Sequence, residues 1–149
     1  MTDIALLPQN GDFSADISLI LAGLATDDGL RTAVIISLFS DARAADDDPL
    51  PHHDADRRGW WGDAYAEIPG DVTGSKLWLL SRAKQLPATL TSAETYARAS
   101  LAWLIADGVA SAVSVVASFP NRGWLGLAID IARPNGPARQ HFDFVWRVT

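Results

Sequence analysis

The chain has 149 residues, with a hydrophobic fraction of 48% and a charged fraction of 20%. These values are those of a soluble globular protein, and the length suits one domain with a single core. No apolar run reaches the roughly 20 residues that cross a bilayer, which excludes a membrane span. The net charge of −6 argues against nucleic acid as a partner, since only 12 basic residues are spread along the chain.

The N-terminal part shows neither a secretory signal nor any means of forming disulfides. The start, MTDIALLPQNGDF, lacks a basic beginning and an apolar core, and the chain contains no cysteine. We therefore expect synthesis in the cytoplasm of the cell. Short apolar pieces in residues 1–24 predict one or two short strands, or a strand and a loop.

Residues 27–41 predict a helix. Apolar or small residues recur at helical spacing between Leu30 and Leu38, and Asp27 or Asp28 is placed to cap the start. The β-branched run VIISLF leaves a buried strand as the alternative. The helical spacing favours the helix.

Residues 40–74 have no hydrophobic period and many turn-forming and acidic residues, which predicts one long irregular segment on the surface. A segment of this length inside a compact domain is usually functional or disordered. Trp60, Trp61 and Tyr65 favour an ordered segment that is held against something, because disordered segments are poor in aromatic residues.

Two more helices are predicted after this segment. Ser75 can cap a short helix over SKLWLLSRAKQ, which Pro87 ends. The longest helix is predicted over residues 92–106, because TSAE has the spacing of a capping box and Gly108 is placed as a C-cap. Its apolar stripe consists of Ala97, Leu101, Leu104 and Ile105.

The C-terminal part predicts a three-stranded antiparallel sheet. Three runs with alternating apolar residues are separated by the turns PNRG and RPNGP. The inward residues are Val113, Val115, Ala117 and Phe119, then Leu125, Leu127, Ile129 and Ile131, then Phe142, Phe144, Trp146 and Val148. The apolar face of this sheet needs a cover. We therefore expect a single α+β domain over residues 1–149, with helices packed on one face of the sheet.

The histidines and aspartates of the long segment do not predict a metal site. His52, His53, Asp54 and Asp56 follow three aspartates at 46–48. Adjacent histidines on a loop do not converge on one ion, and no spacing such as HExxH orients them. A solvated acidic loop is the better interpretation, so we expect neither a metal nor a cofactor.

Asp63 and Glu67 define the strongest enzymatic alternative, a carbohydrate hydrolase. Glycosidases need two carboxylates roughly 5 to 9 Å apart, and the neighbouring tryptophan rings could stack on sugars. The sequence sets neither the separation nor the burial of the two carboxylates. No GxSxG elbow and no phosphate-binding glycine loop is present. We expect no catalytic residue and no small-molecule substrate.

The candidates for a protein interface lie in the stretch DRRGWWGD. They are Arg57, Arg58, Trp60, Trp61 and Asp63. Tryptophan and arginine are the types most enriched at binding hot spots. In the alternative interpretation both rings fold back over the domain and the arginines pair with nearby aspartates. Of the other tryptophans, we expect those at 78 and 103 to be core, and the one at 124 is open.

Four stretches in order resemble the small baseplate wedge proteins of Mu-like contractile phage tails. They are LRTAVIISLFSDARA, RRGWWGD, GSKLWLLSRAK and ARASLAWLIADGVA, which runs into the predicted sheet. The resemblance covers residues 28–149, and residues 1–27 match more loosely. That family is similar in turn to the small wedge proteins of contractile tails and injection machines, whose fold is α+β with helices packed on a small sheet.

The resemblance implies a structural role in the virion, at the tail baseplate. The chain would be a wedge subunit whose partners are the other wedge proteins, the spike hub and the first ring of tail sheath. In the broader group an acidic-proline-arginine turn after the long helix is associated with sheath contact. This chain has ADGV at 106–109, so the sheath contact carries over less directly than the wedge assignment.

The resemblance also sharpens what we expect of the two adjacent tryptophans. One is expected to anchor the long segment to its own domain. The other, with Arg57 or Arg58, is expected to be held out for a neighbouring subunit. The name lysozyme, which is sometimes attached to the broader group, has no support in the weak pair of Asp63 and Glu67. A soluble regulatory binding module with the same fold is the remaining non-enzymatic alternative.

Overall fold

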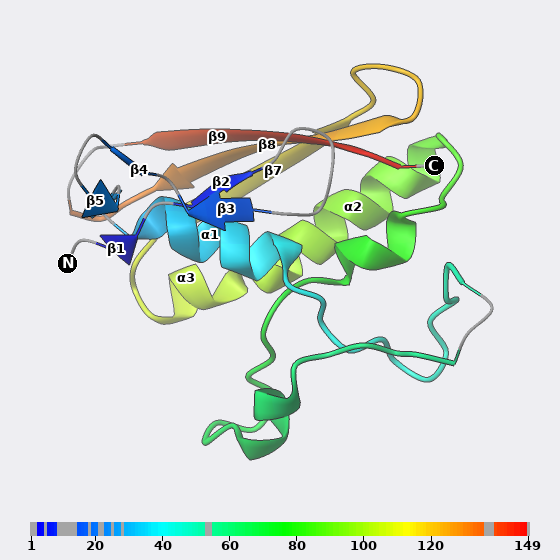
Figure 1. The fold of residues 1–149 in the computed structure, drawn as a ribbon, viewed down its shortest axis with the longest axis horizontal. Helices are drawn as coiled ribbons and strands as arrows, with labels where there is room; N and C mark the ends of the chain where they lie inside the picture. The colour runs from blue at the N-terminus through cyan, green and yellow to red at the C-terminus, as the bar shows by residue number, and fades with distance from the viewer. Residues whose placement is uncertain are drawn as a thin grey trace.

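The computed structural model describes residues 29–52, 55–135 and 139–148 with their side chains, and within residues 1–28 it describes the backbone of six short strands. Figure 1 shows a three-stranded sheet with helices on one face, and a long segment that leaves the helical layer and projects away from it. None of the described helices is long and apolar enough to cross a membrane.

Three antiparallel strands form the C-terminal sheet, in the order in which they occur in the chain: β7 (Ala112–Ser118), β8 (Trp124–Ala132) and β9 (Gln140–Arg147). Leu127 lies opposite Phe144 in the register. The residues predicted to face inward are buried, except Val113 and Phe119, which are partly buried. The predicted sheet and its inward face are therefore confirmed.

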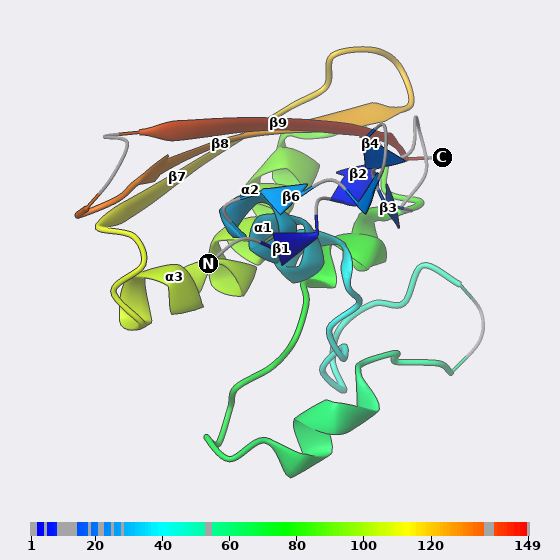
Figure 2. The same ribbon diagram turned by 60° about the vertical axis from the view of Figure 1, so that its left-hand side comes forward.

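The helical layer covers this inward face (Figures 1 and 2). Its elements are α1 (Leu30–Phe39), the 3₁₀ helix η2 (Lys76–Leu80), α2 (Pro87–Ser100) and α3 (Ala102–Ala106). Phe39 of α1 packs edge-on against Phe144 and Trp146, with ring centroids 5.3 and 5.5 Å apart. The predicted α+β fold, with helices packed on one face of a small antiparallel sheet, is confirmed.

Helix α2 begins earlier than the sequence predicts. Pro87 is its first residue, because a proline has no N–H to leave unpaired there and its φ suits a helix. Thr91 therefore lies inside the helix and donates its hydroxyl to the carbonyl of Pro87. The capping box predicted at TSAE is wrong, since Glu94 is directed to the sheet instead.

The predicted helix over 92–106 is divided at Leu101, which has φ −101° and ψ 0°. The N–H of Leu104 donates to the carbonyl of Leu101, an i to i+3 bond that tightens the chain. Leu104 is fully buried while Ile105 is 50% exposed, so the assignment of Ile105 to the apolar stripe is wrong. Gly108, at φ 71°, follows the end of α3 in the left-handed conformation expected after a helix.

The first helix and the 3₁₀ helix differ from the sequence prediction in cap or in type. The N-cap of α1 is Gly29, with no side-chain bond, so the prediction of an aspartate cap is wrong. Ser75 does cap η2, because its Oγ accepts the N–H of Leu77 at 3.2 Å. The segment predicted as a longer helix is only this 3₁₀ helix. All four residues of its run LWLL are buried, whereas an amphipathic α-helix buries one face only.

The N-terminal part contains more strands than the one or two predicted. Six strands of two or three residues form three antiparallel pairs. The pairs are β1 (Asp3–Ile4) with β6 (Thr26–Asp27), β2 (Leu6–Pro8) with β3 (Ala15–Ile17), and β4 (Leu19–Ile20) with β5 (Gly23–Leu24). Strands β2 and β6 contact α1.

Helix α2 also closes the free edge of β7. Glu94 accepts the backbone N–H of Ala117 at 3.0 Å, and Arg98 donates to the carbonyl of Val115 at 2.9 Å. The two side chains bond to each other at 3.0 Å. The hydrogen bond from Ala117, supported by Arg98, holds the pKa of Glu94 below its usual value. These two bonds occupy one N–H and one carbonyl of the edge, which hinders its pairing with another strand.

Leu104 and Ile105 are neighbours that the division of the helix at Leu101 places in different surroundings, one buried and one exposed. We expect Leu104→Ala to lower the free energy of unfolding by about 2 to 5 kcal/mol, because it leaves a cavity in the core. Ile105→Ala should change it by less than about 0.5 kcal/mol. Urea unfolding followed by circular dichroism measures both. Equal losses would show that both side chains are core.

Glu94→Gln should lower the free energy of unfolding by about 1 kcal/mol at neutral pH, since it removes the charge from two hydrogen bonds. The folded pKa of Glu94 is depressed, so its contribution is present above the unfolded value, which is near 4.5, and is lost as the pH falls below it. The difference between wild type and variant should therefore shrink in acid. Asp107→Asn, at an exposed site, is the control. A difference that does not depend on pH would contradict the assignment.

Candidate interaction site

The projecting segment, residues 41–74, is called the arm below. Both ends of the arm are joined at the helical layer, where Asp41 and Ser75 form a parallel bridge. The N–H of Ala42 donates to the carbonyl of Ser75 at 3.0 Å, and the N–H of Ser75 donates to Ser40 at 2.9 Å. Figures 1 and 2 show the arm leaving this junction and dividing into two lobes, of which the first spans residues 45–56 and the second residues 60–73.

Trp78 supports the junction from the core. It is 3% exposed, as predicted, and its Nε1 donates to the carbonyl of Ala42 at 2.8 Å. Ala44, Leu79 and the partly buried Leu50 pack around it in a small second core. The start of the arm is therefore fixed by apolar contacts and by a buried hydrogen bond.

The chain outside the arm is called the body. Of its other tryptophans, Trp146 is buried in the core of the sheet, while Trp103 and Trp124 are less buried than Trp78. Trp103, predicted as core, is partly buried against the main core and donates its Nε1 to Ser37 at 3.0 Å. Trp124, which the sequence left open, is partly buried, with the guanidinium of Arg147 6.0 Å from its ring centre.

Both arginines of the RRGWWGD stretch are used within the chain. Arg58 pairs with Asp41 at 2.7 Å, and its guanidinium lies 4.5 Å from the ring centre of Trp78. Arg57 donates to the carbonyls of Ala45 and Asp46. The alternative interpretation, in which the arginines pair inside the chain, describes their geometry.

A second ion pair ties the first lobe of the arm to η2. Lys76 donates to Asp48 at 2.6 Å, and Asp48 also accepts the N–H of Ala45 at 2.7 Å. The hydrogen bond from Lys76 is the main reason that the pKa of Asp48 lies below its usual value. The arm is an ordered element, held by its polar side chains and by Trp78.

Both glycines of RRGWWGD lie where a Cβ atom would collide with a neighbouring residue. Arg58 and Gly59 both have positive φ, 51° and 101°, and a Cβ on Gly59 would approach the Cβ of Arg43 to 2.7 Å. A Cβ on Gly62 would lie 2.3 Å from the ring of Trp60. The Trp60 ring therefore lies directly on the backbone of Gly62, a place that only glycine leaves open.

The second lobe carries the aromatic residues on its surface. Trp61 begins the 3₁₀ helix η1 (Trp61–Tyr65). Trp60 is 52% exposed, Trp61 75% and Tyr65 79%. The rings contact one another, with centroids 5.6 Å apart for the tryptophan pair and 6.3 Å for Trp61 and Tyr65. These three residues are called the aromatic cluster.

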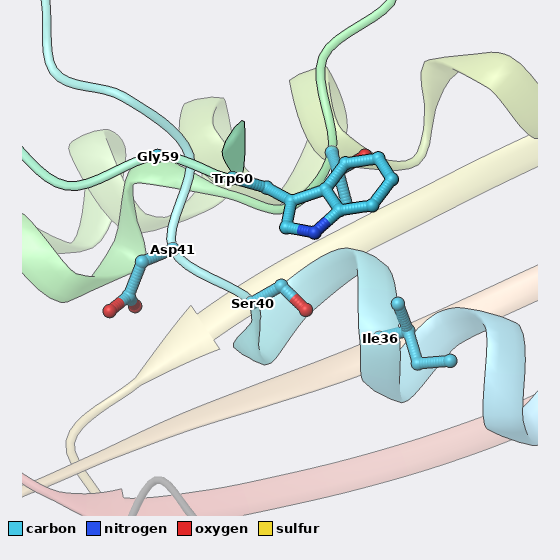
Figure 3. A pocket seen from close by; sticks show the side chains of 6 residues that line it. Ile36, Ser40, Asp41, Gly59 and Trp60 are labelled. Carbon is cyan, nitrogen blue, oxygen red and sulfur yellow. The ribbon is translucent and has the colours of Figure 1, made fainter. Parts of the chain in front are cut away.

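The two tryptophans face different surroundings. Trp60 lies above the end of α1, and Figure 3 shows its indole over Ser40 and Ile36. Together with Asp41, Gly59 and Thr73 these residues line an open pocket of about 480 Å³. Trp61, at the start of η1, is the more exposed of the two rings. The expected division of roles between the two rings stays a prediction.

The described contact of Asp63 lies within its own lobe, and the structure shows no contact between it and Glu67. Asp63 accepts the N–H of Thr73 at 3.1 Å within the lobe, while Glu67 is exposed. His53 and Asp54 lie outside the described residues. In the part of the chain that the structure describes, no group of three histidine, aspartate or glutamate residues is arranged to hold a metal ion.

Comparison with known proteins decides the family. The model of the family described as phage protein GP46 matches residues 30–138, which begin at the start of α1 and end shortly before β9. The chain belongs to the phage gp46 family. The match includes the whole arm, so the arm is within the family region.

Two members of the gp46 family are similar over almost their whole length. The baseplate protein gp46 of Escherichia phage Mu is 48% identical over 136 residues, which is 91% of this chain and 90% of that protein. The Mu-like prophage FluMu protein gp46 of Haemophilus influenzae is 46% identical over 140 residues, covering 94% and 93%. The resemblance to Mu-like phage proteins is confirmed.

Sequence reasoning missed the residues that hold the arm. Asp41, Asp48 and Trp78 act at its base, but their partners are 17 to 36 residues away in the chain. The available signal was the pair of arginines within an acidic segment. It indicated internal pairing as one alternative without naming the partners.

Arg58→Ala should loosen the arm while the body remains folded, because it removes the ion pair with Asp41 and the contact with Trp78. We expect faster cleavage by chymotrypsin after Trp60, Trp61 or Tyr65. The control is Arg43→Ala, an exposed arginine of the arm whose Cβ is retained. Equal cleavage rates for the two variants would show that Arg58 does not hold the arm.

Proposed function

We propose that this protein is a structural subunit of the baseplate of a Mu-like contractile phage tail, and that it serves there as a wedge subunit. The observation that carries the proposal is its 48% identity to the baseplate protein of phage Mu over nine-tenths of both chains. Its place would be the virion, after synthesis in the cytoplasm of the bacterial host. Its partners would be other wedge proteins, the spike hub and the tail sheath.

The arm supports an assembly role. A monomer gains nothing from holding three aromatic rings in water on an ordered, projecting segment, whereas an interface uses such rings as anchors. The pocket between Trp60 and Ile36 could take an apolar side chain of a neighbour. Among the interface candidates, Trp60 and Trp61 would make contact, while Arg57 and Arg58 would hold the contact surface in place and Asp63 would brace η1 against Thr73.

The enzymatic alternatives receive no comparable support. A hydrolase built on Asp63 and Glu67 needs two carboxylates that face one substrate, and the described contact of Asp63 is to the backbone of its own lobe. The relatives are named for the baseplate and the prophage, and neither name denotes an enzyme. A regulatory binding module would act outside a phage tail, whereas one relative is named as a baseplate protein.

Trp61→Ala should leave a folded protein but stop tail assembly. At 75% exposure its loss should change the free energy of unfolding by about 0.5 kcal/mol or less. The variant gene would replace the wild-type gene in the phage or prophage, and tails would be counted by electron microscopy. Val116→Ala, at an exposed residue of the outer sheet face, is the control.

The outcomes for Trp61 separate three cases. Loss of tails with a folded protein supports the assembly role. An unfolded variant would show that the ring is structural. Normal tails from the Trp61 variant would contradict its place at an interface, and normal tails after deletion of the whole gene would overturn the proposed function.

A further inference from the structure

The arm carries the net charge of the whole chain. Residues 41–74 contain nine acidic and three basic residues, while the rest of the chain contains equal numbers of each. The formal charge of −6 therefore belongs to the arm, and the body of the protein is neutral overall. A charge distribution this uneven creates a local field that selects the sign of a partner.

The structure engages two of the arm's three arginines in contacts within the chain and leaves five of its carboxylates exposed. Arg58 is engaged with Asp41 and Trp78, and Arg57 with backbone carbonyls. Among the described residues of the arm, the exposed cation is Arg43. The exposed carboxylates are Asp46, Asp47, Asp56, Glu67 and Asp71.

Both lobes of the arm present these carboxylates. Asp46, Asp47 and Asp56 belong to the first lobe, residues 45–56. Glu67 and Asp71 lie on the second lobe, which also bears the aromatic cluster. Figures 1 and 2 show the two lobes pointing in different directions from one stem. The exposed rings therefore share the second lobe with Glu67 and Asp71, and the first lobe adds three more exposed carboxylates to the same arm.

We propose that the arm binds a positively charged surface of a neighbouring baseplate protein, with apolar side chains of that protein against the aromatic cluster. This inference rests on the proposed function and adds the chemistry of the partner. Burial of the rings supplies affinity, and the exposed carboxylates of both lobes supply partner choice and fast association.

The same charge excludes other occupants. An anionic membrane or a nucleic acid would be repelled by the arm. A contact between the arms of two copies would bring two segments of charge −6 together. The partner's surface must carry lysine or arginine to match the acidic arm. The partner must be a protein, because it also has to offer apolar side chains to the aromatic cluster.

The test reverses charge on both lobes without touching an internal contact. Asp47→Lys with Glu67→Lys replaces two exposed carboxylates for which no partner within the arm is described. The control, Asp107→Lys with Asp143→Lys, makes the same change in net charge on exposed sites of the body, and it removes only the exposed contact of Asp143 with His141. Each variant is co-expressed with the complete set of tail genes, and baseplates are purified by a tag on another tail protein.

The amount of this chain retained in the purified baseplates is measured at low and at high salt. We expect the baseplates to retain at least about tenfold less of the arm variant than of the control variant at low salt, because charges at the rim of an interface act mainly on the rate of association. Wild-type retention should weaken as salt rises, since salt screens charges at the rim of an interface. Equal retention of the two variants would overturn the inference and leave the proposed function standing. Absence of the wild-type chain from baseplates would overturn both.

A carbodiimide, which joins carboxylates to lysines in contact, identifies the occupant. The chain has only two lysines, Lys76 and Lys84. A link between Asp48 and Lys76, 2.6 Å apart, shows that the reaction has worked. Links from Asp47 or Glu67 to a lysine of another tail protein support the proposal. A covalent dimer joined through Lys84 would show a second copy on the arm and would overturn it.

Discussion

The apolar inner face of the sheet formed by β7, β8 and β9 is the constraint on which the rest of the structure depends. Alternating side chains give the face its composition, and it must be covered because one sheet alone cannot bury it. Helix α2 lies across it and satisfies the open edge of β7 through Glu94 and Arg98. Once α1 and η2 pack beside α2, the ends of the arm are brought together at Ser40 and Ser75.

The arm is the place where the fold departs from what stability alone would favour. Its base is held by Trp78, by the pair of Arg58 and Asp41, and by the pair of Lys76 and Asp48. These contacts order a segment whose outer surface is aromatic and acidic. Ordering of the arm favours binding if a neighbouring subunit covers its outer surface, because a preorganised element loses less entropy on binding. This links the polar contacts at the base to the proposed baseplate role.

Much of the fold could be predicted, since it depends on periodicity. The three alternating runs predicted the sheet and its inward face, and the helical spacing after Leu30 predicted α1. The errors have physical causes. Pro87 can start a helix as well as end one, and Glu94 bonded to Ala117 of β7 instead of a helix start. The run LWLL is buried on all sides, so its 3₁₀ form follows from packing and not from a stripe.

For the candidate site, the sequence by itself determined the parts: two tryptophans beside two glycines, two arginines, and an acidic segment with the whole net charge of the chain. It also determined the family through the succession of its motifs. Only the tertiary structure decided the directions, namely that the arginines turn inward and the rings stay exposed. The reason is distance along the chain. Arg58 finds Asp41 and Trp78 only after the packing of α1 and η2 has brought the two ends of the arm together, and no local pattern encodes such a meeting.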